Sequence, residues 1–191
     1  GENAEPMNTI ADYLDHWASV QPDKGLYSFL EVDGTERDAY TYQAFAERTR
    51  NLAEFITGIE ALKPGDRALL VFPPGLEVIV AFMACVRAGI VPVPVYPPTP
   101  MNFEGGLAKI TFVVRDCGAK IALTTRGFLR SYQLLLAKRR ISSLWQSAPA
   151  LPKLEWVTTD DVRGQATNAF RNRTHRATRP ARRDRATGRC L

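Results

Sequence analysis

The stretch "GDRALLVFPPGLEVIVAFMACVRAGIVPVPVYPPTP", Gly65 to Pro100, decides the fold of this 191-residue chain. Its first apolar run, Ala68 to Phe72, is too short for a helix and is typical of a strand buried on both faces. The next segment, 75–89, is apolar nearly all round, which predicts a helix sandwiched in the core. A second apolar run, Ile90 to Tyr96, predicts another strand, so the stretch forms one βαβ unit.

Prolines at five positions between 92 and 100 shape the end of this stretch. Proline has no amide donor and holds φ near an extended value, so a strand that ends here must end abruptly. We interpret residues 90–96 as a central strand of a parallel sheet and residues 97–100 as the stiff exit that stops it. The segment is neither a linker nor, by itself, a ligand site.

Other elements are predicted on the amino-terminal side of this stretch. An amphipathic helix is expected over 9–22, with Thr9 as its N-cap and Pro22 at its end. Its apolar positions at helical spacing are Ile10, Tyr13, Leu14 and Trp17. The Asp33-Gly34 pair between two β-prone runs predicts a hairpin. A second amphipathic helix is expected from Thr41, with an apolar side formed by Phe45, Leu52, Phe55, Ile56 and Ile59.

The alternation of helix and strand continues after residue 100. We expect a helix over 105–118, a buried strand at 119–125, a longer helix over 126–145 and a fourth strand at 153–159. The apolar positions of the first of these helices are Leu107, Ile110, Val113 and Val114. The predicted fold class is therefore α/β, with three layers in which helices cover both faces of a mostly parallel sheet.

Charge divides the chain at Val162. Residues 1–162 hold 16 Lys and Arg against 19 Asp and Glu, whereas residues 163–191 hold nine Arg and a single acid, Asp184. We expect a flexible amino end over 1–7, one domain over 8–162 and an Arg-rich disordered tail over 163–191. The tail has too few large apolar residues to offset chain entropy. Such a tail is expected to bind polyanions nonspecifically.

Cysteine and histidine usage argues against a metal site. Cys85, Cys117 and Cys190 lack CxxC spacing and are too few for a disulfide framework, while His16 and His175 lie far apart, so structural thiols are expected. No run of about 18 uncharged apolar residues appears. The amino end also lacks the features of a secretory signal. We therefore expect no transmembrane segment and a cytoplasmic location.

The Gly65–Pro100 stretch resembles the amino-terminal part of the fatty acyl-AMP ligases, a branch of the adenylate-forming superfamily that includes acyl-CoA synthetases and peptide-synthetase adenylation domains. The similarity extends to "TYQAFAERTRNLA" upstream and "DCGAKIALTT" downstream, and the Tyr96-Pro97-Pro98 ending is typical of these ligases. The resemblance implies the first α/β subdomain of such a ligase. It further implies a reaction in which a fatty acid and ATP, with magnesium, give an acyl-adenylate. The acyl group then passes to the phosphopantetheine thiol of an acyl-carrier protein.

The same resemblance predicts that parts of the ligase are missing. The family's phosphate loop, a Ser/Thr/Gly-rich run ending in Pro-Lys-Gly, should follow "KLEWVTTDD", where this chain reads "VRGQATNAFRNRTHRATRP". The small carboxy-terminal domain with its catalytic lysine is not seen either. We therefore predict no catalytic, ATP-binding or metal-binding residue in this chain, and its substrate-binding residues stay unknown. A truncated fragment that is inactive alone is expected, with the sheet and the 76–88 helix leaving apolar surface that favours self-association.

Several alternatives stay open at this point. The ending results either from a frameshift or truncation near residues 163–172, or it is an authentic basic tail. The chain is a fragment of a fatty acyl-AMP ligase, or of an acyl-CoA ligase, from which only an absent insertion would distinguish it. The alternative from another class is a noncatalytic binding or regulatory protein whose tail engages polyanions.

Four local features have both a functional and a structural interpretation. Pro73-Pro74-Gly75 precedes a helix and could bind an anion, but two of its residues lack amides, which favours a tight structural turn. Glu77 is expected to be a favourable helix-dipole charge rather than a general base. The basic segment Leu136–Arg140 could contact phosphopantetheine or a carrier protein, and a solvated helix end is the simpler interpretation. Gly105-Gly106 is expected to be a flexible loop.

Overall fold

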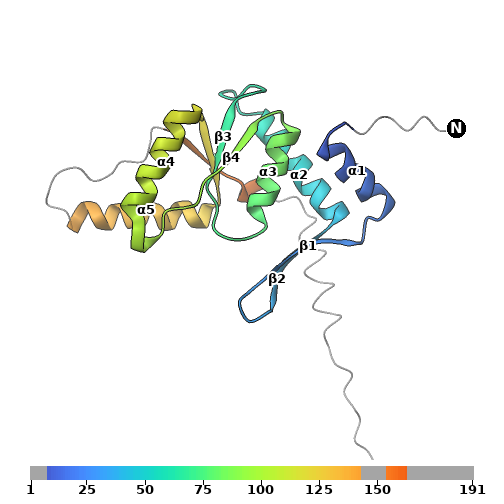
Figure 1. Cartoon of the computed structure of the whole chain (residues 1–191), viewed down its shortest axis with the longest axis horizontal. Helices are drawn as coiled ribbons and strands as arrows, with labels where there is room; N and C mark the ends of the chain where they lie inside the picture. Colours follow the sequence, from blue (N-terminus) through green and yellow to red (C-terminus); the bar gives the residue numbers. More distant parts are fainter. Residues whose placement is uncertain (1–7, 143–153, 163–191) are drawn as a thin grey trace, which may run out of the picture.

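The computed structural model describes residues 8–142 and 154–162 (Figure 1). A four-stranded parallel sheet lies beside a two-stranded antiparallel hairpin, β1-β2. In chain order the elements are α1 (Ile10–Val20), β1 (Gly25–Leu30), β2 (Glu36–Thr41), α2 (Tyr42–Thr57), β3 (Arg67–Leu70), α3 (Glu77–Arg87), β4 (Val91–Pro94), η1 (Pro100–Asn102), α4 (Phe103–Cys117), β5 (Ile121–Thr124), α5 (Arg126–Ser142), β6 (Glu155–Thr158) and η2 (Asp160–Val162).

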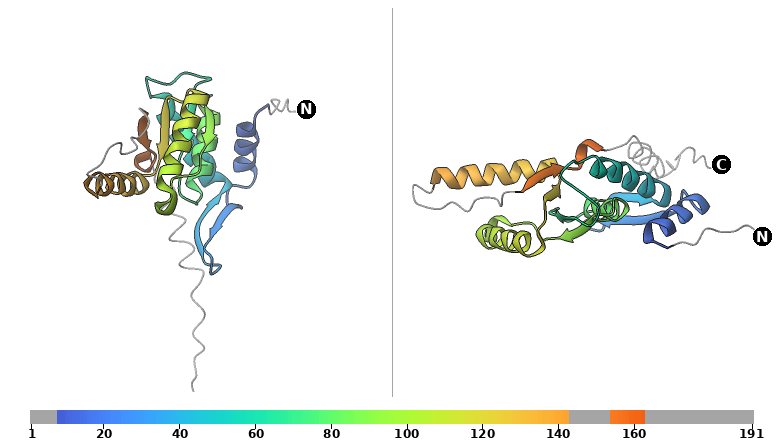
Figure 2. Two further views of the ribbon diagram at one scale, coloured as in Figure 1. Left: turned by 60° about the vertical axis from the view of Figure 1, so that its left-hand side comes forward. Right: turned by 90° about the horizontal axis from the view of Figure 1, so that it is seen from above.

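The parallel sheet has the strand order β4-β3-β5-β6 and lies between two layers of helices. Successive residues of a strand point to opposite faces. Leu70 and Leu123 join the core that the sheet forms with α1, α2 and α3, whereas Leu69 and Ala122 pack with residues of α4 and α5 on the other face. Figure 2 shows these helices on the two sides of the sheet. The predicted three-layer α/β class is confirmed.

The strand of the proline-rich stretch lies at an edge of the described sheet and not in its centre. Within the described residues, β4 pairs with β3 alone. Val91 and Val95 donate their amides to carbonyl oxygens of the β3 segment, at 2.8 and 3.0 Å. Because alternate residues of a strand point their amides to opposite sides, the positions of Pro92 and Pro94 face the open edge. The prediction of a central strand was wrong, since an apolar run does not report how many neighbours a strand has.

Helix α4 begins earlier than predicted and contains the Gly105-Gly106 pair, which we expected in a flexible loop. A Cβ atom on Gly106 would lie 2.7 Å from the Cα atom of Pro98, closer than side-chain carbons can come to backbone. The glycine therefore allows the start of the helix to pack against the proline-rich exit from β4. The expectation of a flexible loop was wrong, because the glycines lie in the helix where Pro98 approaches it closely.

Helix α1 is held at its start by the predicted N-cap. Thr9 Oγ1 accepts from the amide of Asp12 at 3.2 Å, and Asp12 Oδ2 accepts from the amide of Thr9 at 2.8 Å, which makes a capping box. The residues of α1 that reach the core are Leu14 and Ala18. The other predicted apolar positions, Ile10, Tyr13 and Trp17, are 61%, 50% and 41% exposed.

A partly buried arginine connects the first three helices. Arg87, in the last turn of α3, donates to both carboxylate oxygens of Asp15 on α1, at 2.7 and 2.8 Å. Its Nε donates to Thr49 Oγ1 on α2 at 3.0 Å. Such a two-point contact fixes the direction as well as the distance of both partners. The orientation of α1 on the domain is therefore set by hydrogen bonds in addition to its two core residues.

Two predicted turns are confirmed by their backbone. Gly34, in the tip of the β1-β2 hairpin, has a φ of +83°, and Gly118, which ends α4, has a φ of +62°. Both values lie in the left-handed region that glycine adopts without a steric penalty. The hairpin and the end of α4 were predictable for this reason.

Several sequence predictions lie outside the described residues. These concern the amino end 1–7, the Arg-rich segment 163–191 with His175 and Cys190, and the end of the helix predicted over 126–145, so the proposed domain boundaries stay predictions. In the two described ranges, no helix combines the length and the apolar character needed to cross a bilayer.

Candidate functional site at the carboxyl edge of the sheet

The carboxyl ends of the four parallel strands share one edge, and the connections diverge there. From β3 the chain continues into α3, which packs on the same face of the sheet as α1 and α2. By contrast, β4 is joined to β5 by α4, which packs on the opposite face. In open α/β sheets ligands bind beyond the carboxyl ends of the strands, where the strand order reverses. Here that point lies between the ends of β3 and β5. We take this edge as the candidate functional site.

A buried threonine links the ends of β3 and β5 by a hydrogen bond. Thr124 is the last residue of β5 and is fully buried. Its hydroxyl donates to the carbonyl oxygen of Val71 at 2.6 Å, and its own carbonyl accepts the amide of Thr159 at 3.0 Å. Both buried threonines at this edge are therefore bonded to neighbouring strand ends. Side-chain hydrogen bonds therefore hold this edge together, in addition to the backbone hydrogen bonds between the strands.

A buried cation lies behind this edge. Arg48, on α2, is 3% exposed, and its Nη2 donates to Glu77 Oε2 at 3.2 Å and to the carbonyl oxygen of Thr159 at 3.1 Å. Its Nη1 donates to the carbonyl oxygen of Val162 at 3.2 Å. Tyr40, on the hairpin, donates to the other oxygen of Glu77 at 3.4 Å. The cluster joins α2, α3, the hairpin and the segment after β6, and its charges balance, as a buried ion pair requires.

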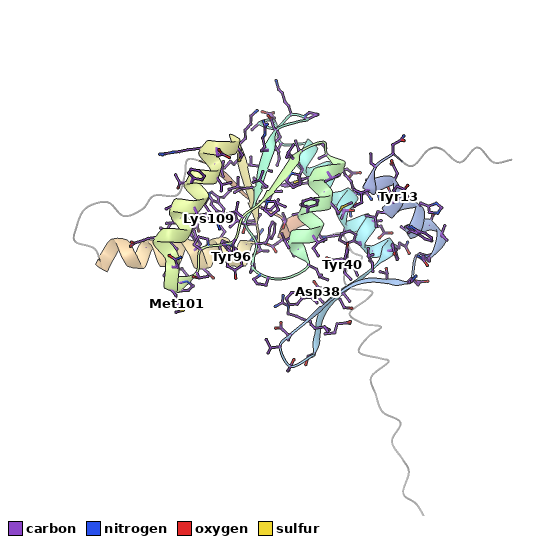
Figure 3. All side chains as sticks on the ribbon, in the orientation of Figure 1. Tyr13, Asp38, Tyr40, Tyr96, Met101 and Lys109 are labelled. Carbon is purple, nitrogen blue, oxygen red and sulfur yellow. The ribbon has the colours of Figure 1, made fainter. Side chains whose placement is uncertain are left out.

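The loop between β3 and α3 is held by the hairpin. Arg37 Nη2 donates to the carbonyl oxygen of Pro74 at 2.8 Å, and the guanidinium carbon of Arg37 lies 4.2 Å from the centroid of the Phe29 ring. The loop therefore offers a carbonyl to its neighbour where a phosphate loop would offer amides. This agrees with the interpretation of Pro73-Pro74-Gly75 as a structural turn. Figure 3 shows the hairpin residues Asp38 and Tyr40 close to this end of α3.

An aromatic cluster lies on the other face, between α4, α5 and β6. The ring centroid of Tyr132 is 5.3 Å from that of Phe103, and 5.9 Å from those of Phe128 and Trp156. The Tyr132 hydroxyl and the Trp156 indole nitrogen are buried and have no hydrogen-bond partner in the described part of the chain. Burial raises the pKa of the Tyr132 hydroxyl well above its ordinary value, so the group stays protonated.

The structure places the sequence candidates as follows. Glu77 lies in the first turn of α3, where a negative charge is favourable, and it also pairs with Arg48. Leu136 packs on the cluster of Phe103, Leu107 and Tyr132, while the side chains from residue 138 to the end of α5 lie outside the description. The site residues that sequence reasoning missed are Arg48, Thr124 and Thr159. No local signal marks them, because their partners lie 29 to 114 residues away.

The described cysteines are free thiols, and Cys85 is part of the core. Burial raises the pKa of Cys85 to about 12, so its thiol is protonated and unreactive near neutral pH. Within residues 8–142 and 154–162, no three side chains of His, Cys, Asp or Glu come together as ligands for a metal ion.

Comparison with known proteins identifies the class to which this fold belongs. The sequence of residues 14–186 matches the family model of the AMP-binding enzymes. The chain therefore belongs to the AMP-binding enzymes, the adenylate-forming superfamily, and corresponds to an amino-terminal portion of them. The resemblance noted in the sequence is confirmed at this level.

Individual relatives refine this assignment. The chain is 28% identical over 156 residues to the medium-chain-fatty-acid–[acyl-carrier-protein] ligase JamA of Moorena producens, covering 82% of this chain and 25% of JamA. It is 32% identical over 164 residues to human Disco-interacting protein 2 homolog A, covering 84% of this chain and 10% of that protein. The structure of a fatty acid AMP ligase from Legionella pneumophila superposes with a TM-score of 0.64 at 26% identity, covering 83% of this chain and 24% of the ligase. The chain thus spans a quarter or less of the length of these relatives.

Proposed function

We propose that this chain forms the amino-terminal scaffold of a fatty acyl-AMP ligase and does not itself perform the adenylation. The observation that carries the proposal is the use of polar groups at the carboxyl edge. Thr124 bonds to Val71, the Arg48 guanidinium bonds to Glu77, and the amide of Arg126 donates to the carboxylate of Asp160. These groups position strand ends and helices, which is the role of a scaffold.

ATP and magnesium do not fit the residues at this edge. A phosphate cradle needs a run of free amides or a basic side chain directed at the ligand. Two of the six residues of the β3-α3 loop are prolines, and the buried Arg48 already neutralises Glu77. Carboxylate and carbonyl oxygens suit magnesium, and the described residues gather no such acidic group. The residues at this edge therefore perform no step of the reaction in this proposal. Nucleotide binding is assigned to parts of the ligase beyond the described residues.

The reaction that the scaffold would serve is the activation of a fatty acid with ATP to an acyl-adenylate, followed by transfer to an acyl-carrier protein in the cytoplasm. Support comes from JamA, whose name states a medium-chain fatty acid and an acyl-carrier protein, and from the Legionella fatty acid AMP ligase. An acyl-CoA ligase is the alternative within the same superfamily. The two differ in the acceptor of the acyl group, which is a carrier-protein thiol in one case and coenzyme A in the other.

A pyrophosphate-exchange assay tests whether the chain is active alone. We expect no fatty-acid-dependent exchange between ATP and labelled pyrophosphate with the purified 191-residue protein. Exchange above the level of a heat-inactivated sample would contradict the proposal.

A chimera tests the scaffold role directly. Residues 14–162 of this chain replace the matching segment of JamA, and acyl-adenylate formation is measured with a medium-chain fatty acid. We expect the chimera to retain acyl-adenylate formation. A folded chimera that forms no acyl-adenylate would show that the segment does not serve this function.

A further inference from the structure

Helix α1 carries an apolar stripe that the other described residues leave largely exposed. The stripe consists of Ile10, Tyr13, Trp17 and Val20, and the exposed fractions of these residues are 61%, 50%, 41% and 58%. Their spacing of three, four and three residues places them on one side of the helix. Single exposed apolar residues are ordinary, whereas a contiguous row with two aromatic rings indicates an interaction surface.

The stripe is presented on a rigid support. The capping box of Thr9 and Asp12 orders the first turn of α1, and the two hydrogen bonds between Arg87 and Asp15 fix its middle. Leu14 and Ala18, on the side of the helix next to the stripe, fasten α1 to the core. Figures 1 and 3 show α1, with Tyr13 labelled, at the end of the molecule away from α4 and α5. A surface held in this way loses little conformational entropy when a partner binds.

The stripe is complementary to itself. In two antiparallel copies of α1 related by a two-fold axis near position 15, Ile10 of one copy lies opposite Val20 of the other, and Tyr13 lies opposite Trp17. Both pairs are symmetric about the same position, so each contact occurs twice, as an isologous interface requires. Antiparallel packing also places the positive end of each helix dipole beside the negative end of the other. We propose that the chain forms a homodimer through the α1 stripe in this register.

A second copy fits the stripe better than a lipid surface does. Amphipathic helices that bind membranes carry Lys or Arg beside the apolar face. The charged residues of α1 are Asp12 and Asp15, and neither Lys nor Arg occurs between residues 10 and 20. Aromatic pairing of Tyr13 with Trp17 would add to the apolar burial. The polar composition of this helix therefore favours a protein partner.

The size of the stripe predicts a weak and reversible dimer. From the exposed fractions, the four side chains offer roughly 400 Å² in each copy, so a dimer would bury on the order of 800 Å² in total. Stable complexes bury about 1,200 Å² or more.

This surface also differs from the one expected from the sequence, which was the 76–88 helix. Helix α3 buries Val80, Met83 and Cys85 and leaves only part of its apolar surface, such as Phe82, exposed.

Sedimentation velocity of the 191-residue chain over a hundredfold range of concentration tests the dimer. We expect a concentration-dependent dimer that the Tyr13→Glu, Trp17→Glu double variant shifts at least tenfold towards monomer. The matched control is Phe112→Glu, at a residue 70% exposed on α4, which should leave the association unchanged. A monomer at all concentrations, or equal loss in both variants, would overturn the proposal. Binding of anionic phosphatidylglycerol vesicles without self-association would overturn it as well.

Cross-linking tests the register. Single Ile10→Cys and Val20→Cys variants are prepared with Cys117 and Cys190 replaced by serine, while the buried Cys85 is kept. A short bismaleimide should join the two variants in a mixture several-fold more efficiently than either variant with itself. Efficient joining of Ile10→Cys with itself would indicate parallel helices and overturn the antiparallel arrangement.

Discussion

Arg48 and Thr159 lie 111 residues apart in the sequence, and the guanidinium of the first donates to the carbonyl oxygen of the second at 3.1 Å. The contact fastens the segment after β6 to α2. The same side chain neutralises Glu77 and donates to the carbonyl oxygen of Val162. One buried cation thus helps to hold the last described segment in place, together with the bonds from Thr159 to Thr124 and from Arg126 to Asp160.

Replacement of this cation should destabilise the domain. In Arg48→Met the carboxylate of Glu77, 16% exposed, loses its counter-charge and two carbonyls lose a donor, so the free energy of unfolding should fall by about 3–5 kcal/mol. Urea unfolding followed by circular dichroism measures the change. Arg50→Met on the exposed side of α2 is the matched control and should cost less than about 0.5 kcal/mol. Equal effects of the two substitutions would show that Arg48 has no special role, and Arg48→Lys serves if Arg48→Met does not fold.

The helical glycines Gly106 and Gly127 should respond in opposite directions to replacement by alanine. Gly106→Ala places a Cβ atom 2.7 Å from Pro98 Cα, whereas a Cβ atom at Gly127 meets nothing within 4 Å. Gly127→Ala should stabilise the chain by about 0.5–1 kcal/mol through helix propensity. Gly106→Ala should destabilise it by about 1–3 kcal/mol through overpacking. Thermal unfolding of both variants measures the difference, and stabilisation by both would contradict the packing argument for Gly106.

The prolines of β4 should protect the edge of the sheet from further pairing. Replacing Pro92 and Pro94 with valine restores two amides that face outward, so the double variant should aggregate several-fold faster in light-scattering measurements at equal concentration. The control variant carries valine at Pro73 and Pro74, in an exposed loop. Similar aggregation rates for the two variants would mean that the prolines do not protect this edge.

The stability of the domain should fall in alkaline solution partly because of Cys85. Folding raises the pKa of this thiol from 9.0 to about 12, so above pH 9 the unfolded chain releases the proton while the folded chain retains it. The free energy of unfolding therefore decreases with rising pH over this window, by at most about 1.4 kcal/mol per pH unit from this group. Cys85→Ala should show a shallower decrease between pH 9 and 11 than wild type. An unchanged slope in Cys85→Ala would exclude the thiol as a source.

The sequence was sufficient wherever the cause of a structure is local. The N-cap Thr9, the hairpin turn at Gly34 and the end of α4 at Gly118 each depend on hydrogen bonds or backbone angles within a few residues. The alternation of apolar strands and helices also predicted the three-layer class, because a buried sheet needs helices on both faces. The family indicated by the Gly65–Pro100 stretch is also the one whose match extends over residues 14–186.

Tertiary structure alone decided how these elements meet. The edge position of β4 and the choice of Gly106 over a larger residue depend on neighbours that the pattern of one strand or helix does not specify. The network around Arg48 joins four distant segments, and no spacing in the sequence marks it. Helical periodicity placed Ile10, Tyr13, Leu14 and Trp17 on one side of α1. Only packing determined that Leu14 reaches the core while the other three stay largely exposed, because burial depends on the other elements and not on the helix itself.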